Sequence, residues 1–173
     1  MKDKDETSML LNEAYSCFYK AYHRINRIAW NGSLPECSFW FYRGRGGRTL
    51  AGAHNGNPHI IICSLSRCLE LPNEHIWGIL AHEMTHIWQY AQGKRGGHGK
   101  DFYAELLRVG VDEDQGWFIS GTPAETLYFL NEQEPILLCD ALQTISKYSS
   151  FKKDEFSYQF SRRKNTDAIL RIF

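Results

Sequence analysis

The chain lacks the features that mark membrane, secreted and repetitive proteins. No apolar run is long enough to cross a bilayer, and the opening residues Met-Lys-Asp-Lys-Asp-Glu contain no hydrophobic signal core. The sequence shows no internal repeat and no low-complexity segment. We therefore expect a cytoplasmic protein without a membrane partner.

Net charge and paired cysteines are missing as well. The 20 Lys and Arg residues balance 20 Asp and Glu residues, which argues against a uniformly basic nucleic-acid-binding surface. No Cys-x-x-Cys pair occurs, and the cysteines are odd in number and widely spaced: Cys17, Cys37, Cys63, Cys68 and Cys139. Such cysteines predict buried free thiols. Metal ligation by Cys63 and Cys68 is the weaker alternative, because no second pair accompanies them.

The length and composition are those of one folded domain. With 173 residues and 43% hydrophobic content, the chain can bury one good core. We predict an α+β fold with an N-terminal helix at residues 8–29 and a small three-stranded antiparallel or mixed sheet. The strands are predicted at residues 38–42, 49–54 and 59–63. The expected core covers residues 8–110, and residues 111–173 form an extension, packed on the core, whose role the sequence does not define.

The extension is predicted to be mainly helical. Thr122 as a cap, Pro123 at the first helical position and Glu125 predict one helix start, and residues 136–145 predict a second helix. Aromatic and basic residues alternate over residues 151–164, a composition that suits stacking on single-stranded nucleic acid. The alternation within residues 156–160 favours an ordinary half-buried strand instead.

The most informative segment is His-Glu-Met-Thr-His at residues 82–86. Asn73 reads as an N-cap and Gly93 ends the pattern, so the segment lies inside a helix of about 19 residues. One face of that helix is apolar: Ile76, Trp77, Leu80, Met84, Ile87, Trp88 and Ala91. His82 and His86 fall on the opposite face, one turn apart, where both can bind one zinc ion. Glu83 is then placed to take a proton from an attacking water as that water adds to a carbonyl.

A catalytic zinc site normally has three protein ligands and one open position. His98 is the favoured third ligand, since it follows the glycine-rich turn at residues 93–97 and opens a second predicted helix that reaches Val109. Glu105 is the rival, because it lies on the same face of that helix and its distance from His86 suits a glutamate-ligand peptidase. Spacing alone does not decide whether His98 or Glu105 is the third ligand.

His82-Glu83-x-x-His86 followed by His98-Gly99-x-x-Phe102 resembles the SprT-like domain, the zinc metallopeptidase core shared with Spartan, which degrades proteins crosslinked to DNA. The order of the helix, the strands and the zinc helix resembles that domain as well. The resemblance implies a Zn²⁺ cofactor held by His82, His86 and His98, with Glu83 as the catalytic base. Many members continue into a C-terminal zinc ribbon with Cys-x-x-Cys pairs, which this sequence does not contain.

These observations predict a zinc-dependent metallopeptidase that hydrolyses peptide bonds in protein substrates, including DNA-associated or DNA-crosslinked proteins. Two alternatives remain. One is a zinc-containing binding module that cleaves nothing, against which Glu83 argues. The other is a zinc peptidase toxin with a specific protein target. No feature of the sequence distinguishes such a target from a DNA-crosslinked protein.

DNA binding has the weakest support in the sequence among these expectations. The cations available for phosphate contacts are few, namely Arg43, Arg45, Arg48, Lys94, Arg95 and those of residues 162–164. We expect micromolar or weaker affinity for single-stranded DNA, falling steeply with salt and showing little sequence preference. Fluorescence anisotropy across a salt series measures this affinity, and replacing Arg162, Arg163 and Lys164 with Ala should weaken it. Undetectable binding at low salt would exclude DNA as a partner of the protein.

Overall fold

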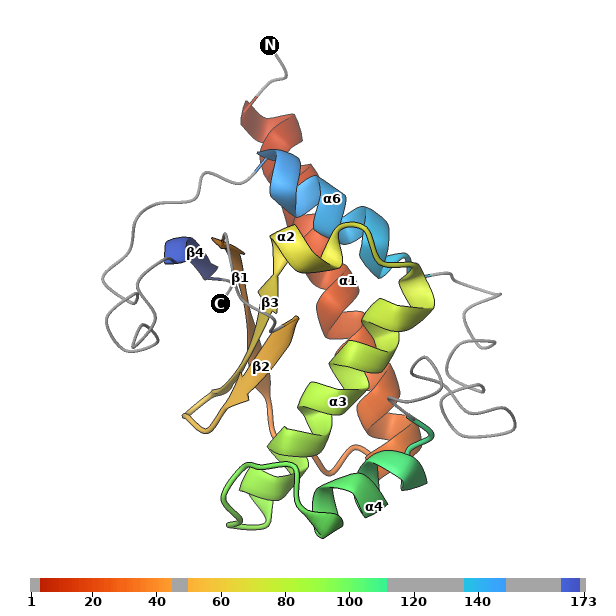
Figure 1. Cartoon of the computed structure of the whole chain (residues 1–173). Helices are drawn as coiled ribbons and strands as arrows, with labels where there is room; N and C mark the ends of the chain where they lie inside the picture. The colour runs from red at the N-terminus through yellow and green to blue at the C-terminus, as the bar shows by residue number, and fades with distance from the viewer. Residues whose placement is uncertain (1–3, 45–49, 112–135, 149–165, 172–173) are drawn as a thin grey trace.

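The computed structural model describes residues 4–44, 50–111, 136–148 and 166–171 (Figure 1). The helices lie on one side of a small sheet, as expected for an α+β domain. The predicted helix start at residues 122–125 and the aromatic and basic segment at residues 151–164 lie outside the described residues.

Helix α1, Lys4–Trp30, is longer at both ends than the sequence predicts. Its apolar side buries Phe18, Tyr22 and Ile25, each 1% exposed. The Phe18 ring lies 5.6 Å from that of Phe39 and 4.9 Å from that of Phe41, both on the neighbouring strand. These aromatic contacts fix α1 across the sheet. Across the described ranges, no helix combines the length and apolar character needed to span a bilayer.

The sheet confirms the three predicted strands and adds a fourth. Strands β1 (Cys37–Gly44), β2 (Ala51–His54) and β3 (His59–Ser64) pair in a mixed arrangement, since β1 runs parallel to β3 and β2 runs antiparallel to β3. Strand β4, Thr166–Arg171, pairs antiparallel with the other side of β1. The order is therefore β2-β3-β1-β4. Strand β4 was not predicted from the sequence, because the alternating pattern in the C-terminal region lies at residues 156–160 and not at residues 166–171.

Helix α3, Asn73–Ala91, follows the short helix α2, Leu65–Cys68. The predicted apolar face is largely confirmed, with Trp77 1% exposed and Met84 and Ile87 fully buried. Ala91 differs, because it lies exposed at the last turn. Gly93 ends the helix as expected, with a φ of 68° that glycine adopts without strain. Helix α4, Lys100–Arg108, then runs back beneath α3 (Figure 1).

Helix α6, Leu138–Tyr148, confirms the second helix predicted in the extension and packs beside α1 (Figure 1). Its start depends on Asn73. The sequence predicts Asn73 as the N-cap of α3, but Pro72 occupies that position. The side-chain oxygen of Asn73 instead accepts hydrogen bonds from the backbone N–H groups of Leu138 at 2.7 Å and Cys139 at 3.4 Å. Asn73 thus caps a helix far along the chain and ties α6 to the start of α3.

Replacing Asn73 with Ala should therefore destabilise the protein through α6. Loss of a capping side chain costs about 0.5–2 kcal/mol of unfolding free energy, and we expect a value in the upper half of that range because the cap also joins two distant segments. Urea unfolding followed by circular dichroism measures it. Asn12→Ala, at an exposed position of α1, is the matched control and should change stability little. Equal stabilities for the two variants would contradict the capping role.

Candidate metal centre

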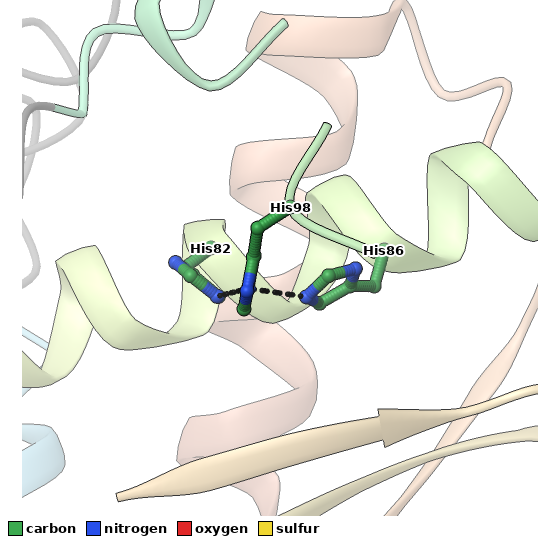
Figure 2. A group of neighbouring side chains, drawn as sticks. All are labelled: His82, His86 and His98. Carbon is green, nitrogen blue, oxygen red and sulfur yellow. Dashed lines mark hydrogen bonds between the residues drawn. The ribbon is translucent and has the colours of Figure 1, made fainter. Parts of the chain in front are cut away.

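Three histidine rings meet at one point between α3 and the loop that follows it. His82 and His86 project from successive turns of α3, and His98 enters between them from the loop at residues 93–99 (Figure 2). The Nε2 atom of His98 lies 3.1 Å from the Nε2 atom of His82 and 3.1 Å from that of His86. The three predicted histidines are therefore brought together.

This geometry fits a tetrahedral metal ion. Zinc binds imidazole nitrogen at about 2.0–2.1 Å, so two nitrogens at a tetrahedral angle lie about 3.3 Å apart. The observed separations of 3.1 Å are close to that value, and all the ligand atoms of the cluster lie within 4.8 Å of one another. Three imidazoles leave a fourth position for water or substrate, which is the pattern of a catalytic site. The cluster can hold a metal ion.

The environment of His82 and His86 favours the neutral form of imidazole, which is the form that binds metals. Burial, together with the neighbouring His86 and His98, lowers the pKa of His82 to about 3. Burial also lowers the pKa of His86, with a further lowering from His98 and an opposing effect of the hydrogen bond to Gln89. Neutral imidazoles offer lone pairs without first losing a proton, so metal binding at neutral pH is not opposed at these two rings.

Phe102 forms the floor under all three rings. Its side chain is fully buried on α4, and its ring centroid lies 4.9 Å from that of His82, 4.4 Å from that of His86 and 4.7 Å from that of His98. From the sequence, Phe102 was recognised only as part of the family motif. Through these contacts, Phe102 of α4 limits how far the three imidazole rings can move toward the interior of the protein.

The cluster opens into a cleft of about 420 Å³ between α3, strand β2 and the loop. Glu83 lines this cleft and is 5% exposed. Tyr90 lines it as well, and its hydroxyl donates a hydrogen bond to the Ala53 carbonyl of β2 at 3.1 Å. Burial, with a smaller contribution from the charge of Glu83, raises the pKa of Tyr90. A carboxylate shielded from bulk water thus shares one cleft with the three imidazoles.

Glu105, the rival third ligand, is engaged elsewhere. Its Oε1 atom accepts hydrogen bonds from Trp30 Nε1 at 2.7 Å and from Arg108 at 2.6 Å, and its Oε2 atom accepts one from Arg108 Nε at 2.9 Å. Burial opposes ionisation of Glu105, but the bonds from Arg108 and Trp30 outweigh it and hold the pKa below its usual value. Glu105 therefore joins α4 to the end of α1 rather than to the histidine cluster.

The cysteines are free thiols, as predicted, and three of them are buried: Cys37, Cys63 and Cys68. Burial, followed by the charge of Glu83, raises the pKa of Cys68 to about 12, and burial raises that of Cys63 as well. Neutral thiols bind metals poorly. Within the described ranges, the three histidines form the one cluster suited to a metal ion, and neither Cys63 nor Cys68 belongs to it.

The site and the fold agree with the comparison to known families. The SprT-like family profile matches residues 18–125, which is more than half of the chain, and the chain belongs to this family. The matched range contains α3, the histidine cluster and α4. No curated protein and no solved structure gives a significant match.

The two candidate third ligands are distinguished by removing each side chain. His98→Ala should lower zinc affinity by more than about a hundredfold, which exceeds the loss caused by removing an outer hydrogen-bond partner of a metal ligand. Glu105→Gln should keep the metal and lower the unfolding free energy by about 1–3 kcal/mol, because the three hydrogen bonds that the carboxylate accepts from Trp30 and Arg108 are weakened. Chelator competition and chemical denaturation measure the two effects. The opposite pattern would make Glu105 the ligand.

Proposed function

We propose that the protein is a zinc-dependent metallopeptidase that cleaves peptide bonds of protein substrates. The observation that carries this proposal is the convergence of three imidazoles beside a buried carboxylate, Glu83, in an open cleft. Membership of the SprT-like family supports it. A binding module without catalytic activity would have no use for Glu83, whose burial is costly unless the charge is compensated.

The chemistry divides between the metal and the chain. A zinc ion held by His82, His86 and His98 would supply Lewis acidity, which polarises a carbonyl and acidifies an attacking water. Glu83 then takes a proton from that water as the new C–O bond forms, and gives it to the leaving nitrogen as the C–N bond breaks. The buried surroundings of Glu83 strengthen its interaction with the proton it carries.

The edge of the sheet offers a place for the substrate. The Leu50 carbonyl accepts a hydrogen bond from the Ser64 N–H at 2.9 Å, and bonded and non-bonded pairs alternate along an antiparallel ladder. Ala51 and Ala53 therefore direct their backbone N–H and C=O groups away from β3, toward the cleft that they line. The hydrogen bond that the Ala53 carbonyl accepts from the Tyr90 hydroxyl agrees with this orientation, because Tyr90 also lines the cleft.

An extended peptide could pair with this edge of β2, which has β3 as its single strand neighbour among the described residues. Backbone pairing would hold a scissile carbonyl near the histidine cluster without requiring particular side chains. The proposed substrate class is accordingly unfolded or extended protein segments, with little sequence preference.

The test of the proposal is Glu83→Gln. The amide keeps the size and polarity of the side chain but cannot accept the proton, so turnover should fall about a hundredfold or more while zinc content and fold are kept. Cleavage of a mixture of denatured proteins by the zinc-loaded protein, followed by gel electrophoresis, measures the rate. Metal analysis of the same samples shows whether zinc is retained.

Glu70→Gln is the matched control, because Glu70 is exposed and precedes the same helix. It should cleave at the parental rate. A Glu83→Gln variant that also cleaves at the parental rate would show the proposed mechanism to be wrong, and a parental protein that binds zinc without cleaving any substrate would favour the binding module.

A further inference from the structure

Gln89 is a buried polar side chain beside the metal centre that neither the sequence motif nor the proposed mechanism uses. It lies on α3, nearly one turn after His86, and is 4% exposed. Burying an amide is costly unless its donors and acceptors are bonded. Its Oε1 atom lies 2.9 Å from His86 Nδ1 and 3.2 Å from the Gly97 N–H, and its Nε2 atom lies 2.9 Å from the Gly97 carbonyl.

The backbone of Gly97 determines which way the amide points. A backbone N–H can only donate a hydrogen bond and a carbonyl can only accept one. The Gln89 atom that faces the Gly97 N–H must therefore be the oxygen, and the atom that faces the Gly97 carbonyl must be the NH₂ group. The two contacts resolve the ambiguity between oxygen and nitrogen that side-chain amides usually carry.

The tautomer of His86 follows from this orientation. The same amide oxygen faces His86 Nδ1, and an oxygen without a proton can only accept. Nδ1 must then carry the hydrogen, which leaves the lone pair of the neutral ring on Nε2. Nε2 is the atom that lies 3.1 Å from His98 Nε2 in the cluster. Gln89 thus selects the form of His86 that can bind a metal through the correct nitrogen.

The second consequence concerns the loop that carries His98. Residues 93–99 contain four glycines among seven residues, so holding this segment in one conformation costs considerable backbone entropy. The ion pair between Lys94 and Asp101 is exposed and contributes little. Gln89 binds both backbone groups of Gly97, the residue directly before His98. It therefore restrains the loop at the point where the third ligand leaves it.

We propose that Gln89 is a positioning residue that joins the second and third ligands of the metal centre, fixing the tautomer of His86 and the placement of His98 through one side chain. The inference rests on the metal centre of the proposed function and not on peptide cleavage. The hydrogen bonds of Gln89 to His86 and Gly97 involve only atoms of the chain, so the effect of Gln89 on His86 can be measured separately from metal binding.

The first measurement is the tautomer of His86 in metal-free protein labelled with ¹⁵N-histidine. Two-bond ¹H–¹⁵N correlation spectra separate rings protonated at Nδ1 from rings protonated at Nε2, and the His86 signals are assigned by their absence in His86→Gln. The parent should show the Nδ1–H form. Gln89→Leu removes the acceptor and should produce a mixture of tautomers. Gln89→Glu keeps an acceptor for both His86 and the Gly97 N–H, and should retain the Nδ1–H form.

The second measurement is zinc affinity by chelator competition on the same variants. Gln89→Leu should lose about 10–100-fold, the usual effect of removing an outer partner of a metal ligand. Gln89→Glu should lose less, because only its contact with the Gly97 carbonyl is broken. Gln92→Leu, an exposed position on the turn after Gln89, is the control and should match the parent in both measurements. Circular dichroism confirms that each variant is folded.

Three results would overturn the proposal: a parent with His86 protonated at Nε2, a folded Gln89→Leu with parental tautomer and affinity, or a Gln89→Glu that loses the Nδ1–H form. If Gln89→Leu does not fold, the tautomer of the parent and the tautomer and zinc affinity of Gln89→Glu decide the proposal. A parent that binds no zinc would refute the metal centre, whereas the tautomer spectra would still establish or refute the action of Gln89 on His86.

Discussion

The orientation of α3 about its own axis is the constraint on which the site depends. Each residue of a helix turns the side chain by about 100°, so a shift of one position would carry His82 and His86 out of the cleft. Trp77, Met84 and Ile87 prevent this shift, because they are buried on the opposite side of the helix. Packing in the apolar core therefore determines which residues of α3 face the cleft. Because close-packed side chains move little, the orientation of His82 and His86 is also restrained.

The parts of the site that could be predicted are those encoded by local spacing. His82 and His86 share a helix, so their common face follows from helical geometry alone. The choice between His98 and Glu105 could not be made in this way, since both positions satisfy the spacing. Tertiary contacts place the two side chains differently. Trp30, far away in the chain, binds Glu105, and such a pairing leaves no periodic pattern in the sequence.

The same distinction holds for the fold. The strands of residues 37–64 and the helices α1, α3 and α6 were predictable from alternation and helical periodicity, with errors mainly at their ends. The parallel pairing of β1 with β3 was not, because two strands with the same pattern can pair in either direction. Asn73 was assigned to the wrong helix for a related reason. A capping residue is recognised by its neighbours in sequence, whereas the N–H groups that it binds belong to Leu138 and Cys139.

The position of β4 has a consequence for the nascent chain. Strand β1 lies between β3 and β4, so its outer side can be covered only after residues 166–171 have left the ribosome. Until then, β1 and β2 each have one side without a partner among the described strands, and unpaired edges invite pairing with other chains. The pairing of β1 with β4 also spans most of the sequence, which makes it slow to form. Translation thus passes through an interval of heightened risk of intermolecular β-pairing. The arrival of β4 ends that interval at β1, whereas no strand among the described residues pairs with the edge of β2 at the cleft.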